Sequence, residues 1–313
     1  MSLPHLHQTI VNGDKDAFKI ALANKCDPNQ LDPIMGNAPL HIAVQGDNVY
    51  MIESLLQAGA FINLQTPSHG MTPLMIAVWH RRPLVIKFLL TQPEINIEIV
   101  STFGIKAEDL IAFIAQEKDD FGLQQAEEIH TLFSDYKQRV AADMALLDEF
   151  KIAIDNNLSD LEKAEKIHNL KTCNYLNHTS TVSCSGSDGH TAILVAARDG
   201  LVKTAIELIK KGADQTVPDY YMKAIPLHKA AYNGNAEIIR ILANAPGFHT
   251  VLDAQGPNNG YTPLHDAVWH GHVEAAEVLI KAGARKDLRG FDGKTPLELA
   301  KEYKYQKIID LGL

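Results

Sequence analysis

The sequence has few cysteines and no long apolar run, and both absences narrow what the protein can be. Only three cysteines occur among 313 residues, an odd number without the spacing of a disulfide framework, and this favours a reducing compartment. No segment approaches the roughly 20 continuous apolar residues of a membrane span, and the N-terminus lacks a basic stretch followed by an apolar run. We therefore expect a cytoplasmic protein that does not insert into a membrane.

Clusters of basic residues are also missing. The formal net charge is −9, and the lysines and arginines are scattered along the chain. This balance argues against nucleic acid or an anionic membrane as the main partner. Apolar residues make up 46% of the chain and charged residues 21%, an ordinary globular composition that supports one or two packed domains.

Familiar catalytic and nucleotide-binding motifs are absent as well. The sequence contains no Gly-rich dinucleotide motif, no GxSxG and no HExxH. The Gly-Lys-Thr at 293–295 is not a phosphate-binding loop, because that loop needs glycine where Leu288 stands. We predict a protein that is not an enzyme and that carries no cofactor.

What the sequence does contain is a hexamer that returns along the chain, at 38–43, 72–77, 191–196, 225–230, 262–267 and 295–300. Its best copies begin with Thr-Pro-Leu and all close with alanine, which recurs every 33 to 37 residues where copies are adjacent. Threonine predicts an N-cap and proline the first helical position. A second amphipathic helix follows, and Gly59, Gly212 and Gly283 are predicted to end it in their repeats.

This hexamer resembles the Thr-Pro-Leu-His-x-Ala signature of the ankyrin family. The resemblance implies a mainly α protein, an ankyrin-repeat α-solenoid of helix-turn-helix units with short β-turn fingers, interrupted by an inserted helical segment. One helix pair cannot bury its apolar face alone, so stability is expected from stacking on neighbours. The resemblance also implies that His41, His228 and His265 hydrogen-bond between fingers.

Departures from the hexamer define the expected domains. Residues 1–120 are predicted to form an N-terminal stack of about three to four repeats, the first and last degenerate. Residues 121–145 are predicted to form an inserted helical segment, because the surrounding stretch lacks proline and is rich in helix-forming residues. Residues 146–313 are predicted to form a C-terminal stack of about five repeats, the first degenerate.

The resemblance further implies that a protein partner meets the concave side, made from finger tips and the exposed part of each first helix. Both tryptophans stand two residues after a signature alanine, in twin Ala-Val-Trp-His segments at 77–80 and 267–270. Exposed aromatic residues suit binding hot spots, whereas the alternative is local packing between repeats. The residues predicted to contact a partner are Trp79, His80, Arg81, Arg82, Arg198, Tyr221, Met222, Tyr232, Asn233, Tyr261, Trp269, His270 and Phe291.

An alternative from a different class is an enzyme or zinc protein with a site in the irregular region 116–190. The potential zinc ligands that cluster there are Cys173, His178, Cys184 and His190. Structural zinc sites usually show more closely spaced cysteine pairs, so we predict no metal. The same loop offers a cysteine nucleophile with a histidine base, but no known signature surrounds either cysteine.

The predicted setting follows from resemblance alone. With its degenerate repeats and irregular helical insertion, the chain resembles ankyrin proteins that intracellular bacteria deliver into the host-cell cytoplasm as effectors. A eukaryotic cytosolic adaptor is the alternative. In either setting the chain is expected to be monomeric and to act as a scaffold for a protein partner.

Overall fold

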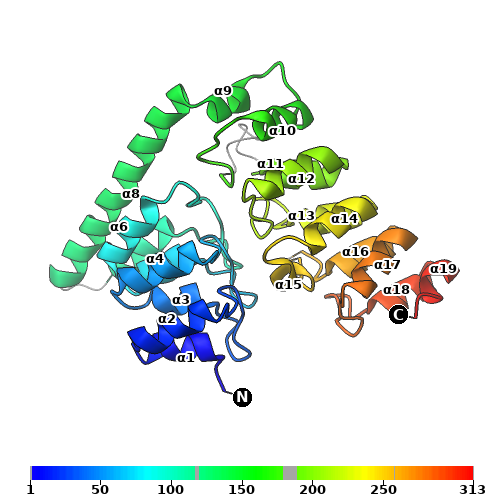
Figure 1. Cartoon of the computed structure of the whole chain (residues 1–313), viewed down its shortest axis with the longest axis horizontal. Helices are drawn as coiled ribbons and strands as arrows, with labels where there is room; N and C mark the ends of the chain where they lie inside the picture. The colour runs from blue at the N-terminus through cyan, green and yellow to red at the C-terminus, as the bar shows by residue number, and fades with distance from the viewer. Residues whose placement is uncertain (1, 117–119, 179–188, 257, 313) are drawn as a thin grey trace. The chain divides into compact units, whose positions relative to one another are not determined.

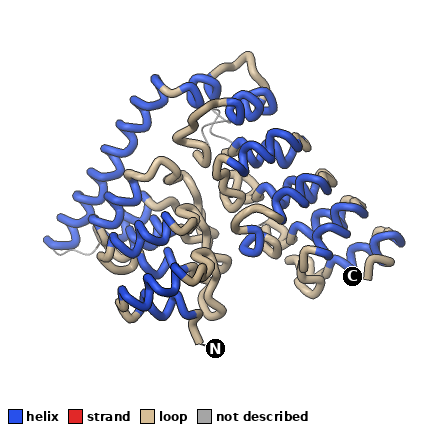
Figure 2. The backbone as a smooth tube through the Cα atoms, viewed as in Figure 1, coloured by secondary structure: helices blue, strands red, loops and turns tan. Residues whose placement is uncertain are grey.

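The computed structural model describes residues 2–116, 120–178, 189–256 and 258–312. Within these residues the chain is built from helices, turns and loops and contains no β-strand (Figure 1, Figure 2). The mainly helical solenoid predicted from the sequence is therefore confirmed. The chain divides into two compact units, Met1–Leu146 and Leu147–Leu313.

The first unit holds three regular helix pairs and an irregular end. Its elements are α1 (His5–Val11), α2 (Lys15–Ala23), α3 (Pro39–Ala43), α4 (Val49–Gln57), α5 (Pro73–Trp79), α6 (Pro83–Leu90), the 3-10 helix η1 (Glu108–Leu110), α7 (Ile111–Ile114) and α8 (Asp120–Leu146).

The second unit is built from consecutive helices that pack against one another. Its elements are α9 (Asp148–Ile154), α10 (Asp160–Asn169), α11 (Ala192–Asp199), α12 (Val202–Lys210), α13 (Pro226–Tyr232), α14 (Ala236–Ala243), α15 (Phe248–Val251), α16 (Pro263–Trp269), α17 (Val273–Lys281), α18 (Pro296–Glu302) and α19 (Gln306–Ile309).

The first helix of a repeat begins where a Thr-Pro pair predicts. The hydroxyls of Thr72, Thr262 and Thr295 each accept a hydrogen bond from the amide three residues on, at 3.3, 3.4 and 3.3 Å. Proline then fills the first helical position, where no amide donor is needed. The second helices end as predicted too, since Gly59 and Gly212 have φ of 93° and 90°, the left-handed region that favours glycine.

Stacking of the second unit depends on small and branched residues that are fully buried. The signature residues Ala230 and Ala267 expose none of their surface, and neither do Leu227 and Leu264. Alanine at this place lets α11, α13 and α16 pack side by side (Figure 1). Because one pair has no core of its own, each repeat depends on its neighbours for burial.

The signature histidines join consecutive fingers, as predicted. The Nε2 atoms of His41, His228 and His265 donate to a carbonyl of the next finger at 2.8, 3.2 and 3.2 Å. Burial lowers the pKa of His41 and of His228 to about 4, so both rings are neutral at pH 7. His7 makes the same contact at 2.9 Å, which marks α1 and α2 as a true repeat.

The irregular end of the first unit is completed by α8. The pair η1 and α7 packs against α5, and with no Thr-Pro available the Asp109 carboxylate accepts from the Lys106 amide at 2.8 Å. Helix α8 packs on α6 and α7, with Ile129 and Phe133 fully buried. The predicted insertion 121–145 thus lies within α8 and belongs to the first unit, while the predicted three-part division of the chain stays a prediction.

Candidate partner-binding site

A pocket opens in the second unit on the side formed by first helices and fingers. It has a volume of about 370 Å³. Helices α11, α13 and α16 and two fingers contribute its walls, so three consecutive repeats build it. The residues that line it are Arg198, Met222, Ala224, His228, Lys229, Tyr232, Asn233, Gly256, Asn258, Asn259, Asp266 and Trp269.

Five of these residues, Arg198, Met222, Tyr232, Asn233 and Trp269, are among those predicted to contact a partner. The structure therefore brings together, around one pocket, side chains that the sequence places in three different repeats. Their contact with a partner stays a prediction.

The aromatic residues at the pocket form a strip of touching rings. Tyr232 and Trp269 meet edge to face with centroids 6.5 Å apart, and Tyr261 meets Trp269 the same way at 5.7 Å. The Trp269 indole Nε1 donates to the Tyr303 hydroxyl at 3.3 Å. Trp269 remains 36% exposed and Tyr232 46% exposed. The strip therefore presents two large rings to solvent, and Tyr261 and Tyr303 contact Trp269 from within the unit.

The structure corrects the expectation that Tyr261 is a surface residue. Only 8% of Tyr261 is exposed, because its ring stacks on His265 at 5.1 Å and its hydroxyl donates to Asp292 at 2.9 Å. Burial and the Asp292 carboxylate raise the pKa of the Tyr261 phenol. Tyr261 therefore supports Trp269 from behind.

The finger aromatics and His270 differ in exposure. Tyr221 and Phe291 are 77% and 70% exposed, and the Phe291 ring covers Gly260, where an added Cβ would lie 2.6 Å from it. His270 is half-buried, and its ring centroid lies 4.0 Å from that of Tyr232. Burial lowers the pKa of His270, which makes it a neutral neighbour of the strip.

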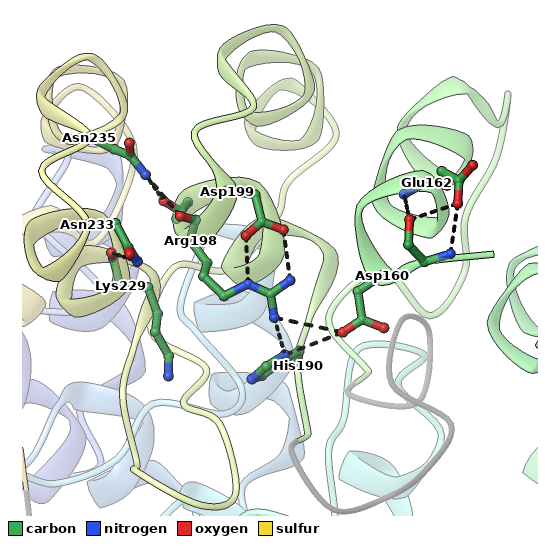
Figure 3. A network of polar contacts seen from close by, with 10 residues as sticks. Asp160, Glu162, His190, Arg198, Asp199, Lys229, Asn233 and Asn235 are labelled. Carbon is green, nitrogen blue, oxygen red and sulfur yellow. Dashed lines mark hydrogen bonds and ion pairs between the residues drawn. The ribbon is translucent and has the colours of Figure 1, made fainter.

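Arg198 closes the pocket at the α11 end and is already engaged in ion pairs. Figure 3 shows its guanidinium between the side chains of Asp199, Asp160 and His190. Arg198 Nη2 lies 2.7 Å from Asp199 Oδ2, and Nη1 lies 3.8 Å from Asp160 Oδ2 and 3.3 Å from His190 Nδ1. Asn235 donates to the Arg198 carbonyl at 3.0 Å, so the whole residue is fixed in place.

Two further charged residues line the pocket, and sequence reasoning missed both. Lys229 forms an ion pair with Asp219 at 2.8 Å. Asp266 is 8% exposed, and burial raises the pKa of its carboxyl to about 7 although Lys229 opposes the shift. Both are the fifth residue of their hexamer, and the other copies carry Ile42, Ile76, Val195 and Leu299 at this position. A charged residue at a position that is otherwise apolar is the signal by which the sequence could have revealed them.

The candidates in the first unit form a separate, smaller surface. Trp79 is 57% exposed, and His80 follows it at the end of α5. Arg81 adopts a left-handed φ of 55°. Arg82 holds the neighbouring repeat, because its Nε donates to the Gln45 carbonyl at 2.7 Å; this contact gives Arg82 a structural role.

The potential zinc ligands do not converge in the part of the chain that the structure describes. His178 lies within an aromatic cluster, with its ring centroid 5.9 Å from those of Phe150 and Tyr175. His190 lies beside Arg198, Cys173 is half-buried, and Cys184 lies outside the described residues. No group of three or more His, Cys, Asp or Glu side chains among those described could hold a metal ion.

Within the same described residues, no helix is both long and apolar enough to cross a membrane.

Comparison with known proteins relates the chain to several animal proteins through its repeats. Over 111 residues it is 32% identical to human Ankyrin repeat and SOCS box protein 3, covering 36% of this chain and 21% of that protein. Over 140 residues it is 26% identical to the tyrosine-protein kinase HTK16 of Hydra vulgaris, covering 41% and 17%. Over 125 residues it is 29% identical to human cyclin-dependent kinase 4 inhibitor B, covering 40% and 86%.

The chain spans about a fifth of the length of the first two relatives, so the likeness concerns their repeats alone. The family model described as Ankyrin repeats (3 copies) matches residues 6–101 and 222–290, more than half of the chain. The chain therefore belongs to the ankyrin-repeat family.

Proposed function

We propose that the protein is a non-enzymatic interaction module that binds a protein partner through the pocket and aromatic strip of its second unit. Ankyrin repeats are generally protein–protein interaction modules, and this chain belongs to their family. The observation that carries the proposal is the pairing of two large exposed rings, Tyr232 and Trp269, with a pocket of about 370 Å³ that they both line.

The rigidity of these rings favours a binding role. Trp269 is held by the Tyr303 hydroxyl and by the edge of Tyr261, so little rotamer entropy is lost when a partner covers it. A ring that served only local packing would be buried, as Tyr261 is. The exposed faces of Tyr232 and Trp269 therefore suit the centre of an interface.

The surface around Trp79 is a second candidate contact. The exposed ring of Trp79 has His80 and Arg81 next to it in the sequence. Arg82 already donates to the Gln45 carbonyl and to the Asp47 carboxylate. We propose it as an auxiliary surface.

The test is affinity capture from a eukaryotic lysate with the full-length chain as bait. The double variant Tyr232→Ala/Trp269→Ala should lose the proteins that the wild type retains, while Tyr50→Ala, which removes an exposed ring outside both candidate surfaces, should keep them. Circular dichroism and thermal unfolding check that the fold persists. Unchanged capture by the double variant would contradict the proposal, and collapse of its fold would show that the rings are packing residues.

The setting remains the one predicted from sequence. We propose a reducing, cytosolic environment, as a bacterial effector inside a host cell or as a eukaryotic adaptor. The competing enzyme or zinc site in 116–190 has less support, because the ligand candidates described there point to separate neighbours.

A further inference from the structure

The pocket contains one acidic side chain that makes no direct hydrogen bond or ion pair in the described structure, although the charge of Lys229 favours its ionised form. Asp266 is 8% exposed and lines the cavity, yet its carboxylate has no hydrogen-bond or ion-pair partner among the described residues. The other charged residues of the wall are paired, Lys229 with Asp219 at 2.8 Å and Arg198 with Asp199 at 2.7 Å. A buried carboxylate without a partner is costly, so the pocket is electrostatically incomplete when empty.

The fold does not require an acid at this position. The equivalent residues of four other hexamers are Ile42, Ile76, Val195 and Leu299, and Val195 and Leu299 are buried there. Apolar side chains therefore occupy this position in four other repeats. The acid appears in the repeat whose first helix also carries Trp269 into the pocket wall, which links the carboxylate to the pocket.

The remaining wall suits a flat cation with an apolar stem. The edge-to-face rings of Tyr232 and Trp269 offer the electron-rich faces that attract cations. Met222 and Ala224 supply apolar surface on the finger side. A guanidinium stacks on aromatic rings and bonds a carboxylate with two parallel donors, which an ammonium cannot do.

The charges of the pocket wall favour a basic ligand group over an acidic one. Lys229 and Arg198 already have carboxylate partners at ion-pair distance, so an anion would compete with Asp219 or Asp199 and would approach the Asp266 carboxylate. A cation instead meets the one acidic side chain of the wall that lacks a direct ion-pair partner. Its arrival would favour the ionised form of Asp266 and give the carboxylate a hydrogen-bonded partner.

We propose that this pocket receives an arginine side chain of the protein partner, with the guanidinium against Asp266 and its plane beside Trp269 and Tyr232. The inference rests on the proposed function and adds the chemistry of the contact. It gives the partner a recognisable feature, an exposed arginine that reaches into the groove.

The test uses the full-length chain with ¹⁵N-labelled tryptophan, because the sequence has only two tryptophans. Trp79 is a built-in control, since Ile76 stands where its twin segment has Asp266. N-acetyl-L-arginine amide is titrated at millimolar concentrations and the two indole N–H signals are followed. The Trp269 signal should shift and saturate, and the Trp79 signal should not move.

Two comparisons isolate the charge contact. N-acetyl-L-citrulline amide, which has nearly the same shape without the charge, should bind at least about tenfold more weakly, since a hydrogen bond to a charged group contributes roughly 1.5–3 kcal/mol. Asp266→Asn should weaken arginine binding to the citrulline level. Circular dichroism confirms that the variant is folded.

Equal shifts with citrulline, full binding to Asp266→Asn, a shift of Trp79 alone, or no shift of Trp269 would each overturn the arginine assignment. A saturable shift of Trp269 with N-acetyl-L-glutamate amide would reverse the sign and overturn it as well. If the assignment fails while Tyr232→Ala/Trp269→Ala still releases captured proteins, the proposed function stands without it. If that double variant captures normally, the proposed function itself is wrong.

Discussion

Asp266 should make the second unit less stable as the pH rises, and Asp266→Asn should remove that effect. Burial raises the carboxyl pKa to about 7 from 3.8. The folded state therefore holds a proton that the unfolded state has lost between these two values, and the free energy of unfolding falls through that window. Above pH 7 both states are ionised and the full penalty is present.

The magnitude follows from the two pKa values. A difference of about three units corresponds to roughly 4 kcal/mol at pH 8, because each unit is worth 1.36 kcal/mol. At pH 5 the same linkage gives roughly 2 kcal/mol. The stability of Asp266→Asn relative to the wild type should thus increase by about 2–3 kcal/mol from pH 5 to pH 8.

The assay is equilibrium urea unfolding followed by the fluorescence of Trp269, in a Trp79→Phe background that leaves one reporter in the second unit. Asp214, whose pKa burial raises to about 6, adds the same pH dependence to both proteins and cancels in the difference. Burial lowers the pKa values of His228 and His265, and both histidines are present in both proteins. A stability difference that is equal at pH 5 and pH 8 would refute the reasoning.

Three simpler substitutions test the fold. Arg81→Gly should raise the free energy of unfolding by about 0.5–1 kcal/mol, because Arg81 has φ of 55° where Gly234 and Gly271 stand in other repeats; an unchanged or lower denaturation midpoint would contradict this. Thr295→Ala should cost about 1 kcal/mol by removing the cap of α18, measured by urea unfolding against Thr172→Ala at an exposed threonine outside the hexamers. Leu264→Ala should cost about 2–5 kcal/mol, since the side chain is fully buried, and a loss below 1 kcal/mol in thermal unfolding would show that the stack closes around the cavity.

Much of the fold could be predicted because its rules are local. A Thr-Pro pair caps a helix wherever it stands, a glycine after the second helix ends it, and a small alanine marks the place where helices meet. His7 was missed because neither Thr-Pro nor the closing alanine accompanies it, although it makes the same finger contact as His41.

The site was harder to predict, since burial there depends on neighbours from other repeats. Tyr261 looks like an exposed finger residue in the sequence, yet it is buried between His265 and the Asp292 carboxylate. Asp266 looks like an ordinary surface acid, and only the stacking of α13 beside α16 shows that it is enclosed. Tyr303, which accepts the hydrogen bond from Trp269, stands three residues after the closing alanine of its hexamer, whereas both tryptophans stand two residues after theirs. The repeat pattern therefore did not point to it.

The three-repeat origin of the pocket has a mechanical consequence. Its walls come from α11, α13 and α16, so a small twist of one repeat against the next changes the spacing between Arg198, Tyr232 and Trp269. A ligand seated there would act as a wedge that fixes the pitch of the solenoid, and any force that bends the solenoid would in turn alter the grip on that ligand.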